Sequence, residues 1–270
     1  MKQLQNIDEL SSLISTFFKK GTSTNNYVLL DAYTSHIAEG KLNFITTEDN
    51  VVFLLEKHDF FQLYFYINNF AQPIHLPDDR PVVMEIIYRG LSNEPAEIID
   101  YWYEHGFNKH LTRDNLTAVW NKIEIPASKK SDTLVIFAKV ESEVVFAHQL
   151  LENALDRYTG DLLSLHELRN YCEQGNLLCA YHEGELAGVL QFEIKNKVVW
   201  LGHIAVDERF RGKGIANELV ARYILENKMD DNTRYALWVI QDNIGAVNLY
   251  RKFGFVYGGK STVSLLKLNI

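Results

Sequence analysis

Residues Arg209–Ala216 read RFRGKGIA, and they carry the strongest local signal in the chain. An apolar run that predicts a β-strand precedes them, and apolar residues at helical spacing follow them. A helix N-terminus presents unpaired amides and a partial positive charge, and glycines let an anion reach those amides without meeting a Cβ atom. The stretch therefore predicts a phosphate-binding loop that begins a helix, with a solvated basic turn as the alternative.

The composition is that of a folded, acidic protein. Hydrophobic residues make up 47% of the 270 residues and aromatic residues 12%, which excludes an intrinsically disordered chain. With 27 Lys and Arg against 35 Asp and Glu, the net charge is -8. This charge repels phosphate backbones, so we expect neither nucleic acid nor a membrane surface as the main partner. Any bound anion must be held by a local group of donors, such as the RFRGKGIA loop.

Signals for metals, disulfides and targeting are missing from the sequence. Cys172 and Cys179 have the spacing of neither a disulfide framework nor a zinc site, and the histidines show no metal-ligand spacing. The first twenty residues lack the apolar region of a signal peptide, and no apolar run approaches the ~18 residues that span a bilayer. We therefore expect a cytoplasmic globular protein without a bound metal.

The chain is expected to divide near its middle. All five prolines lie at or before Pro126, and Ile125–Asp132 is polar, small and charged, as linkers are. The sequence therefore predicts two domains, 1–131 and 132–270. In the second, hydrophobic periodicity predicts helices near 142–157, 162–172, 212–224 and 243–253, strands near 134–139, 177–181, 186–194, 198–206 and 235–239, and two short closing strands. This order is a mixed α/β pattern.

Two nucleotide-binding motifs do not fit their context. The dinucleotide fingerprint requires a third glycine where Asn217 stands, and further βαβ units for which the remaining chain is too short. Gly254–Ser261 (GFVYGGKS) satisfies the Walker A expression, but a predicted helix precedes it and a short β-like tail follows. A Walker A loop lies between a strand and a helix, so this match is accidental.

A second motif begins about thirty residues after the glycine loop. Asn243–Phe255 reads NIGAVNLYRKFGF and predicts a helix stopped by a glycine before a strand. Taken alone, its Tyr250 is an ordinary packed tyrosine. Arg-x-x-Gly-x-Gly followed at this spacing by Asn-x-x-Ala-x-x-Leu-Tyr-x-x-x-Gly-Phe resembles the GNAT superfamily of N-acetyltransferases. The resemblance covers roughly residues 133–270 and implies a mixed, mostly antiparallel sheet flanked by helices.

The resemblance also implies a role for each matched position in binding acetyl-CoA. A splayed strand would pair with the pantetheine arm, Asn243 would hydrogen-bond the same arm, and Tyr250 would protonate the departing thiolate as general acid. Arg209 and the backbone amides of the glycine loop would hold the diphosphate. The cofactor-binding residues are thus expected to be Ile204, Ala205, Val206, Arg209, Arg211, Gly212, Lys213, Gly214, Ile215, Ala216 and Asn243.

The base that removes the proton of the attacking amine has no carboxylate candidate on this strand. His203 titrates in a suitable range and is the candidate, although a lone histidine on a strand is more often a packed one. We expect an acyl-CoA-dependent N-acetyltransferase that acts on a small-molecule or peptide amine. Two alternatives stay open: a regulator that binds acyl-CoA without turnover, and an interaction scaffold.

The first half of the chain echoes the second. Tyr101–Phe107 (YWYEHGF) lies 148 positions before Leu249–Phe255 (LYRKFGF), and both predict a helix end, a glycine and a strand. The shift places Trp102 where Tyr250 stands. Phe60–Phe70 contains neither glycine nor cation, so this half resembles a degenerate GNAT copy that has no cofactor site.

The aromatic residues of the first half have two interpretations. They belong to the core of that half, or they line a wall of the acceptor pocket. The residues concerned are Phe60, Phe61, Tyr64, Tyr66, Tyr101, Trp102 and Tyr103. Elsewhere in this half, helices are predicted near 7–20 and 27–39, and strands near 42–46, 51–55 and 61–66.

Overall fold

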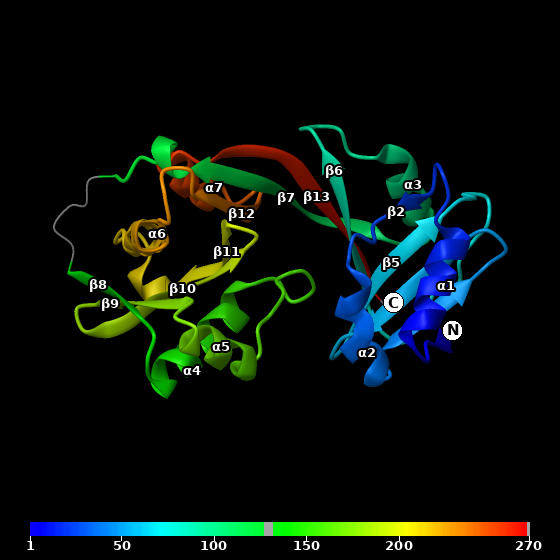
Figure 1. Cartoon of the computed structure of the whole chain (residues 1–270), viewed down its shortest axis with the longest axis horizontal. Coiled ribbons are helices and arrows are strands. Elements are labelled where there is room, and N and C mark those ends of the chain that lie inside the picture. Colours follow the sequence, from blue (N-terminus) through cyan, green and yellow to red (C-terminus); the bar gives the residue numbers. More distant parts are fainter. Residues whose placement is uncertain (127–131, 269–270) are drawn as a thin grey trace. The chain divides into compact units, whose positions relative to one another are not determined.

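Two units, each a β-sheet with helices on both faces, make up the chain in the computed structural model, which describes residues 1–126 and 132–268 (Figure 1). Unit 1 comprises Met1–Thr112 together with Lys260–Ile270, and unit 2 comprises Arg113–Gly259. Within the described ranges, no helix is both long enough and apolar enough to cross a membrane.

The sheet of unit 2 runs in the order β7-β12-β11-β10-β9-β8. Strands β11 and β12 are parallel, and the other neighbouring pairs are antiparallel. The strands are β7 (Asn108–Val119), β8 (Thr133–Phe137), β9 (Leu177–His182), β10 (Glu185–Lys195), β11 (Val198–Val206) and β12 (Arg234–Ile240). The helices are η2 (Trp120–Lys122), α4 (Glu141–Ala154), α5 (Leu165–Glu173), η3 (Glu208–Phe210), α6 (Ile215–Glu226) and α7 (Ile244–Lys252).

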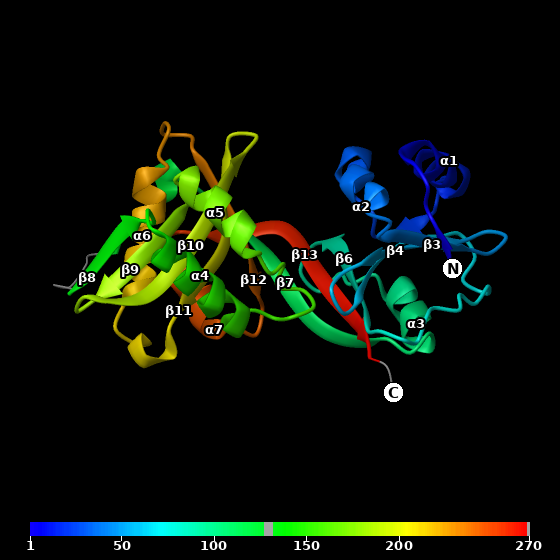
Figure 2. The same ribbon diagram turned by 90° about the horizontal axis from the view of Figure 1, so that it is seen from below.

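Helices α4 and α5 cover one face of this sheet, and α6 and α7 cover the other (Figures 1 and 2). Helix α5 begins at a capping box: the Ser164 hydroxyl accepts from the Glu167 amide, and the Glu167 carboxylate accepts from the Ser164 amide. On α6, Leu219, Tyr223 and Ile224 recur at helical spacing and are fully buried. Burial of these apolar stripes supplies most of the stability of such helices.

Unit 1 repeats the strand pattern of unit 2. Its sheet runs β1-β3-β4-β5-β6-β13, with β5 and β6 parallel and β2 paired with β5. The strands are β1 (Lys2–Gln3), β2 (Ser23–Thr24), β3 (Leu42–Thr46), β4 (Val51–Glu56), β5 (Phe61–Ile67), β6 (Val82–Arg89) and β13 (Val256–Lys267). The helices are α1 (Ile7–Phe17), η1 (Leu30–Tyr33), α2 (Thr34–Ala38) and α3 (Ala96–Glu104), with α1 and α2 on one face and α3 on the other (Figure 2).

Each half of the sequence gives its last strand to the unit built from the other half. Arg113–Val119 of β7 pair with Arg234–Ile240 of β12, although β7 follows the first half in sequence. Lys260–Lys267 of β13 pair with Val82–Arg89 of β6. The units are therefore divided after residues 112 and 259, and not at the expected boundary between 131 and 132. Most of the expected linker, residues 127–131, lies outside the described residues.

The structure confirms the mixed α/β class and the mostly antiparallel sheet. Two local predictions were wrong. The two short closing strands are one strand, β13, which begins at the third residue of the Walker A match and continues past its end, so a strand and not a helix follows the match. The helix predicted near 27–39 is only η1 and α2, because the chain between β2 and Leu30 forms no regular element. Most of the aromatic residues singled out in the first half are core residues; Tyr64 is half-buried and Tyr103 is exposed.

The strand exchange predicts which fragments fold. A fragment of residues 113–259 keeps the β7–β12 ladder and should unfold cooperatively on heating. A fragment of residues 132–270 loses that ladder together with the buried side chains of Leu116 and Ala118, and it exposes the edge of β12. An unpaired inner edge of this length favours aggregation. We expect this second fragment to be insoluble or unfolded by circular dichroism; equal melting temperatures for the two fragments would contradict the division.

Candidate functional site

Strands β11 and β12 diverge half-way along their length. Val198–Leu201 pair with Arg234–Leu237, but the parallel ladder ends there. The rest of β11, Gly202–Val206, is paired with β10 alone, while the end of β12 pairs with β7. The edge of β11 that faces away from β10 therefore carries backbone polar groups without a strand partner, and such groups are strong hydrogen-bonding sites. The predicted splayed strand is present.

A β-bulge lies at the point of divergence. The register of β10 against β11 shifts between Gln191 and Phe192, opposite Gly202. The Gln191 side chain is 3% exposed, and a Cβ atom on Gly202 would lie 2.0 Å from its Oε1 atom. Glycine at 202 therefore makes room for a buried glutamine. Bulges bend a strand and increase its twist, which accounts for the departure of β11 from β12.

The bulge also decides which side chains of β11 share a face. Ile204 and Val206 pack against the cluster that contains helix α6, whereas Ala205 belongs to the cluster beneath α4 and α5. By strand alternation His203 lies on the face of Ala205. Tyr250 is a member of the α6 cluster. His203 and Tyr250 therefore lie on opposite faces of the same strand.

The glycine loop presents free amides at the start of α6. Gly212 and Gly214 have positive φ values of +79° and +84°, which favour glycine, and a Cβ atom at either would meet nothing within 4 Å. Gly214 directly precedes α6, whose first residue, Ile215, is 1% exposed. In the described part of the chain no acceptor faces the amides between Gly212 and Ala216. The loop therefore presents backbone donors beside open space, as the predicted phosphate-binding loop requires.

The cations of the loop are only partly available. Arg209 donates to the Asp207 carboxylate at 2.9 Å and lies 3.5 Å from that of Glu185, and the same guanidinium holds the pKa of Asp207 below its usual value. The Arg209 guanidinium and the Lys213 ammonium both lie over the Phe210 ring, at 5.0 and 5.2 Å from its centroid. Arg211 and Lys213 are exposed. Arg209 is therefore a shared cation in the described structure, and the backbone amides are the free donors.

Tyr250 and Asn243 come from helix α7. Tyr250 is 3% exposed, and burial raises the pKa of its phenol. Its hydroxyl makes no hydrogen bond to any described residue. Asn243 is the N-cap of α7: its Oδ1 atom accepts from the Ala246 amide at 3.0 Å, and its Nδ2 group is left without a partner in the described ranges. Both side chains thus keep one free polar group.

The backbone carbonyl of Asp161, in the loop between α4 and α5, lies within reach of a hydrogen bond from the His203 ring. Burial lowers the pKa of His203 below its ordinary value of 6.5, and the charge of Arg113 acts in the same direction. The carboxylates of Asp161 and Glu193 oppose the shift without reversing it. A neutral imidazole has one donor and one acceptor nitrogen, so the second nitrogen is free to accept a proton.

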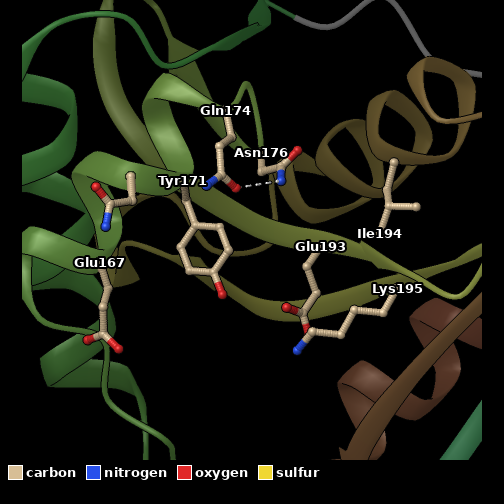
Figure 3. A pocket seen from close by; sticks show the side chains of 8 residues that line it. Glu167, Tyr171, Gln174, Asn176, Glu193, Ile194 and Lys195 are labelled. Atoms are coloured by element: carbon tan, nitrogen blue, oxygen red, sulfur yellow. Dashed lines mark hydrogen bonds and ion pairs between the residues drawn. The ribbon is translucent and has the colours of Figure 1, made fainter. Parts of the chain in front are cut away.

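A pocket of about 320 Å³ has the Glu193 carboxylate in its lining (Figure 3). The Tyr171 side chain points into it, on the side where Glu193 and Lys195 lie. Burial raises the pKa of Tyr171, and Glu193 and Asp161 add to the effect. Lys195, which also lines the pocket, opposes this shift. The pocket is lined by Glu167, Asn170, Tyr171, Gln174, Asn176, Glu193, Ile194 and Lys195.

The equivalent place in unit 1 is filled by the chain itself. Strands β5 and β6 also diverge, after two residue pairs. The Asn25 side chain lies between them: its Nδ2 group donates to the carbonyl oxygens of Leu63 (2.9 Å) and Glu85 (3.1 Å), and its Oδ1 atom accepts from the Phe65 amide at 2.8 Å. Strand β2 pairs with the rest of β5. No helix occupies residues 68–81, where unit 2 has α6 between the corresponding strands.

Sequence reasoning missed Gln191, Asp161 and Arg113. Gly202 within a predicted strand was a usable signal, because an isolated strand glycine often marks a bulge. The other residues gave none: Asp161 acts through its carboxylate and its backbone from a loop distant in sequence, and Arg113 belongs to the first half of the sequence. Across the described residues, no group of three or more His, Cys, Asp or Glu side chains could hold a metal ion.

Comparison with known proteins gives a family match within the second half of the chain. Residues 146–255 match the model of the acetyltransferase (GNAT) family. The spermine/spermidine N(1)-acetyltransferase of Bacillus subtilis is 32% identical over 89 residues, and a probable spermine N(1)-acetyltransferase of B. subtilis subsp. natto is 29% identical over the same length. Each match covers 30% of this chain and 59% of the relative, so the chain spans well under two thirds of these proteins.

Solved structures share the fold over a longer part of the chain. A GCN5-related N-acetyltransferase from Sphaerobacter thermophilus covers 81% of this chain and 76% of its own, with a TM-score of 0.57 at 13% identity. A tandem GNAT protein from the clavulanic acid biosynthesis pathway covers 84% and 83%, with a TM-score of 0.55 at 12% identity. A Drosophila protein covers 98% and 96%, with a TM-score of 0.56 at 13% identity. With the family match and the splayed strand, residues 146–255 form a domain of the GNAT acetyltransferase family.

Proposed function

We propose that unit 2 transfers an acyl group, most simply acetyl, from acyl-CoA to an amine. The observation that carries this proposal is the pairing of two features in one unit. Within the part of the chain that the structure describes, this edge of β11 lacks a strand partner from Gly202 onward, and amides of the glycine loop without an acceptor follow it within a few residues. The first feature suits an extended amide-containing chain, and the second suits a phosphate group.

The residues present fit acyl-CoA. The amides from Gly212 to Ala216 would hold the diphosphate, since nothing occupies the space above either glycine. Ile204, Ala205 and Val206 would offer backbone groups to the pantetheine amides, and the free Nδ2 group of Asn243 would be a further donor. The Arg209 guanidinium would also donate to the phosphates if it kept only part of its contact with the Asp207 carboxylate. Arg211 and Lys213 are exposed cations near the same loop.

When bound, acyl-CoA supplies a thioester that a neutral amine attacks, with formation of an amide and release of a thiolate. The β11 backbone would stabilise negative charge on the carbonyl oxygen, because its unpaired amides are fixed in advance. Tyr250 would give its proton to the thiolate: burial raises the pKa of the phenol, so the proton is present throughout the physiological range. His203, kept neutral by burial, would take the proton of the amine.

An aliphatic amine is the acceptor class that we favour. The curated relatives are spermine/spermidine acetyltransferases, and polyamines are cations. Asp161 and Glu193 give the surroundings of His203 a negative charge, which attracts a cationic amine and steers its approach. Spermidine, spermine and diamines are therefore the first acceptors to assay.

We further propose that each chain has one acyl-CoA site, and that unit 1 is a GNAT-like copy without one. Asn25 and β2 use the strand edge to which a pantetheine arm would bind. Residues 68–81 contain no helix whose N-terminus could hold a diphosphate. Unit 1 would then act as a structural partner that completes the fold of the chain.

Replacing Gly212 with Glu tests the cofactor site. A carboxylate in the loop repels the diphosphate, so we expect the dissociation constant for acetyl-CoA, measured by isothermal titration calorimetry, to rise by about tenfold or more. Gly21→Glu is the matched control, because Gly21 also has positive φ (+93°) and open space around its Cβ position. Absence of heat with the wild type, or equal affinity in Gly212→Glu, would contradict the proposal.

Replacing Tyr250 with Phe tests the acid. We expect kcat with the best amine acceptor to fall by about a hundredfold or more, with little change in acetyl-CoA affinity or melting temperature, since the hydroxyl has no partner in the described residues. Tyr235→Phe is the control: its hydroxyl donates to the Ile224 carbonyl at 2.9 Å, so its loss should cost about 1 kcal/mol of stability and leave kcat unchanged. Binding of acetyl-CoA by a wild type that acetylates no amine would favour the regulator instead.

Replacing Asn25 with Ala tests the single site. The change leaves buried backbone groups of β5 and β6 without partners, so we expect a loss of about 2 kcal/mol or more of unfolding free energy in urea. The stoichiometry of acetyl-CoA binding should stay at one per chain, because unit 1 still lacks a helix for the diphosphate. A stoichiometry of two in the wild type would refute this part of the proposal.

A further inference from the structure

The loop between α4 and α5, residues 155–164, is anchored on strand β7. The Arg113 guanidinium donates from Nη2 to both the carbonyl oxygen and the hydroxyl of Thr159, each at 2.8 Å. From the other side, the Asp156 carboxylate accepts from the Thr159 amide and hydroxyl, each at 2.8 Å. Thr159 is therefore held both by its own turn and by a strand that is distant in sequence.

The anchor lies two residues from the group that binds His203. Between them stands Gly160, where a Cβ atom would lie 2.3 Å from the Asp156 carbonyl oxygen. Asp161 follows with a positive φ of +48°, an uncommon conformation for a residue with a side chain. Because this turn is tight, a shift of Thr159 would also shift the Asp161 carbonyl. That carbonyl lies within reach of a hydrogen bond from the His203 ring.

The charged groups that face His203 come from three elements. Asp161 lies in the α4–α5 loop, Glu193 on β10, and Arg113 on β7. Arg113 favours the neutral ring, and the two carboxylates favour the charged ring. Loss of the Arg113 charge would therefore raise the pKa of His203, and a loosened loop that admits water would raise it further.

We propose that Arg113 is a positioning residue for His203: it fixes Thr159, and through the Gly160–Asp161 turn it holds the imidazole by one nitrogen and leaves the other available to take a proton. The part of this role that concerns catalysis rests on the function proposed above. The anchoring of the loop and of the ring does not.

The experiment combines NMR titration of the imidazole with kinetics on the full-length chain. The His203 signal is assigned by its absence in His203→Gln. In Arg113→Met, we expect the pKa of His203 to rise by about half a unit or more, and the acidic limb of the kcat profile to move in the same direction. Arg113→Lys, which keeps the charge and a donor, should restore most of both. Arg222→Met is the control, because Arg222 forms a surface ion pair with Glu226 on α6.

Thr159→Val separates anchoring from charge. It removes the hydroxyl that joins Arg113 to Asp156 and changes no charge, so a smaller shift in the same direction supports positioning. If Arg113→Met does not fold, the His203 titration in Thr159→Val tests the proposal instead. An unchanged His203 titration in both variants would overturn the proposal. If the wild type acetylates no amine, the proposed function fails, while the titration still decides whether Arg113 positions the ring.

Discussion

The divergence of β11 from β12 is the constraint on which the rest of the site depends. Backbone amides and carbonyls inside a sheet must find partners, and leaving them without any costs free energy comparable to a lost hydrogen bond. A sheet that opens half-way therefore needs something in the opening. In unit 1, the Asn25 side chain and strand β2 form hydrogen bonds with the β5 backbone in this opening. Unit 2 gives this edge of β11 no strand partner among the described residues, and this difference between two similar sheets is the strongest structural argument for a ligand.

The exchange of strands makes the two halves of the sequence interdependent. Strand β7 completes the sheet of unit 2, and it also delivers Arg113 to the loop beside His203. A first half without a cofactor site, as proposed above, would be expendable if it only accompanied the other half. Here its last strand is part of the second sheet, so the first half cannot be removed without removing structure from the site.

Local pattern was enough for much of unit 2 and for the glycine loop. The strand predicted near 198–206 is β11, and the helix predicted near 243–253 is α7, because period and glycine stops are local properties. Register and strand order are not local. Nothing in the period of β7 says that it pairs with β12, which lies 115 residues or more further along the chain. The shift of 148 residues aligns α3 with α7, but it does not align the strands that precede them. Residues 68–81 contain no counterpart of α6, so the connection in unit 1 is shorter.

Burial gives the two proposed proton carriers the protonation states that acyl transfer requires. A low-dielectric environment disfavours the charged form of any group. For Tyr250 this raises the pKa and keeps the proton on the phenol, as an acid requires. For His203 it lowers the pKa and keeps the imidazole neutral, as a base requires. The bulge at Gly202 places the two groups on opposite faces of β11. The same effect, burial, can therefore leave a base ready to deprotonate the amine on one face and an acid ready to protonate the thiolate on the other.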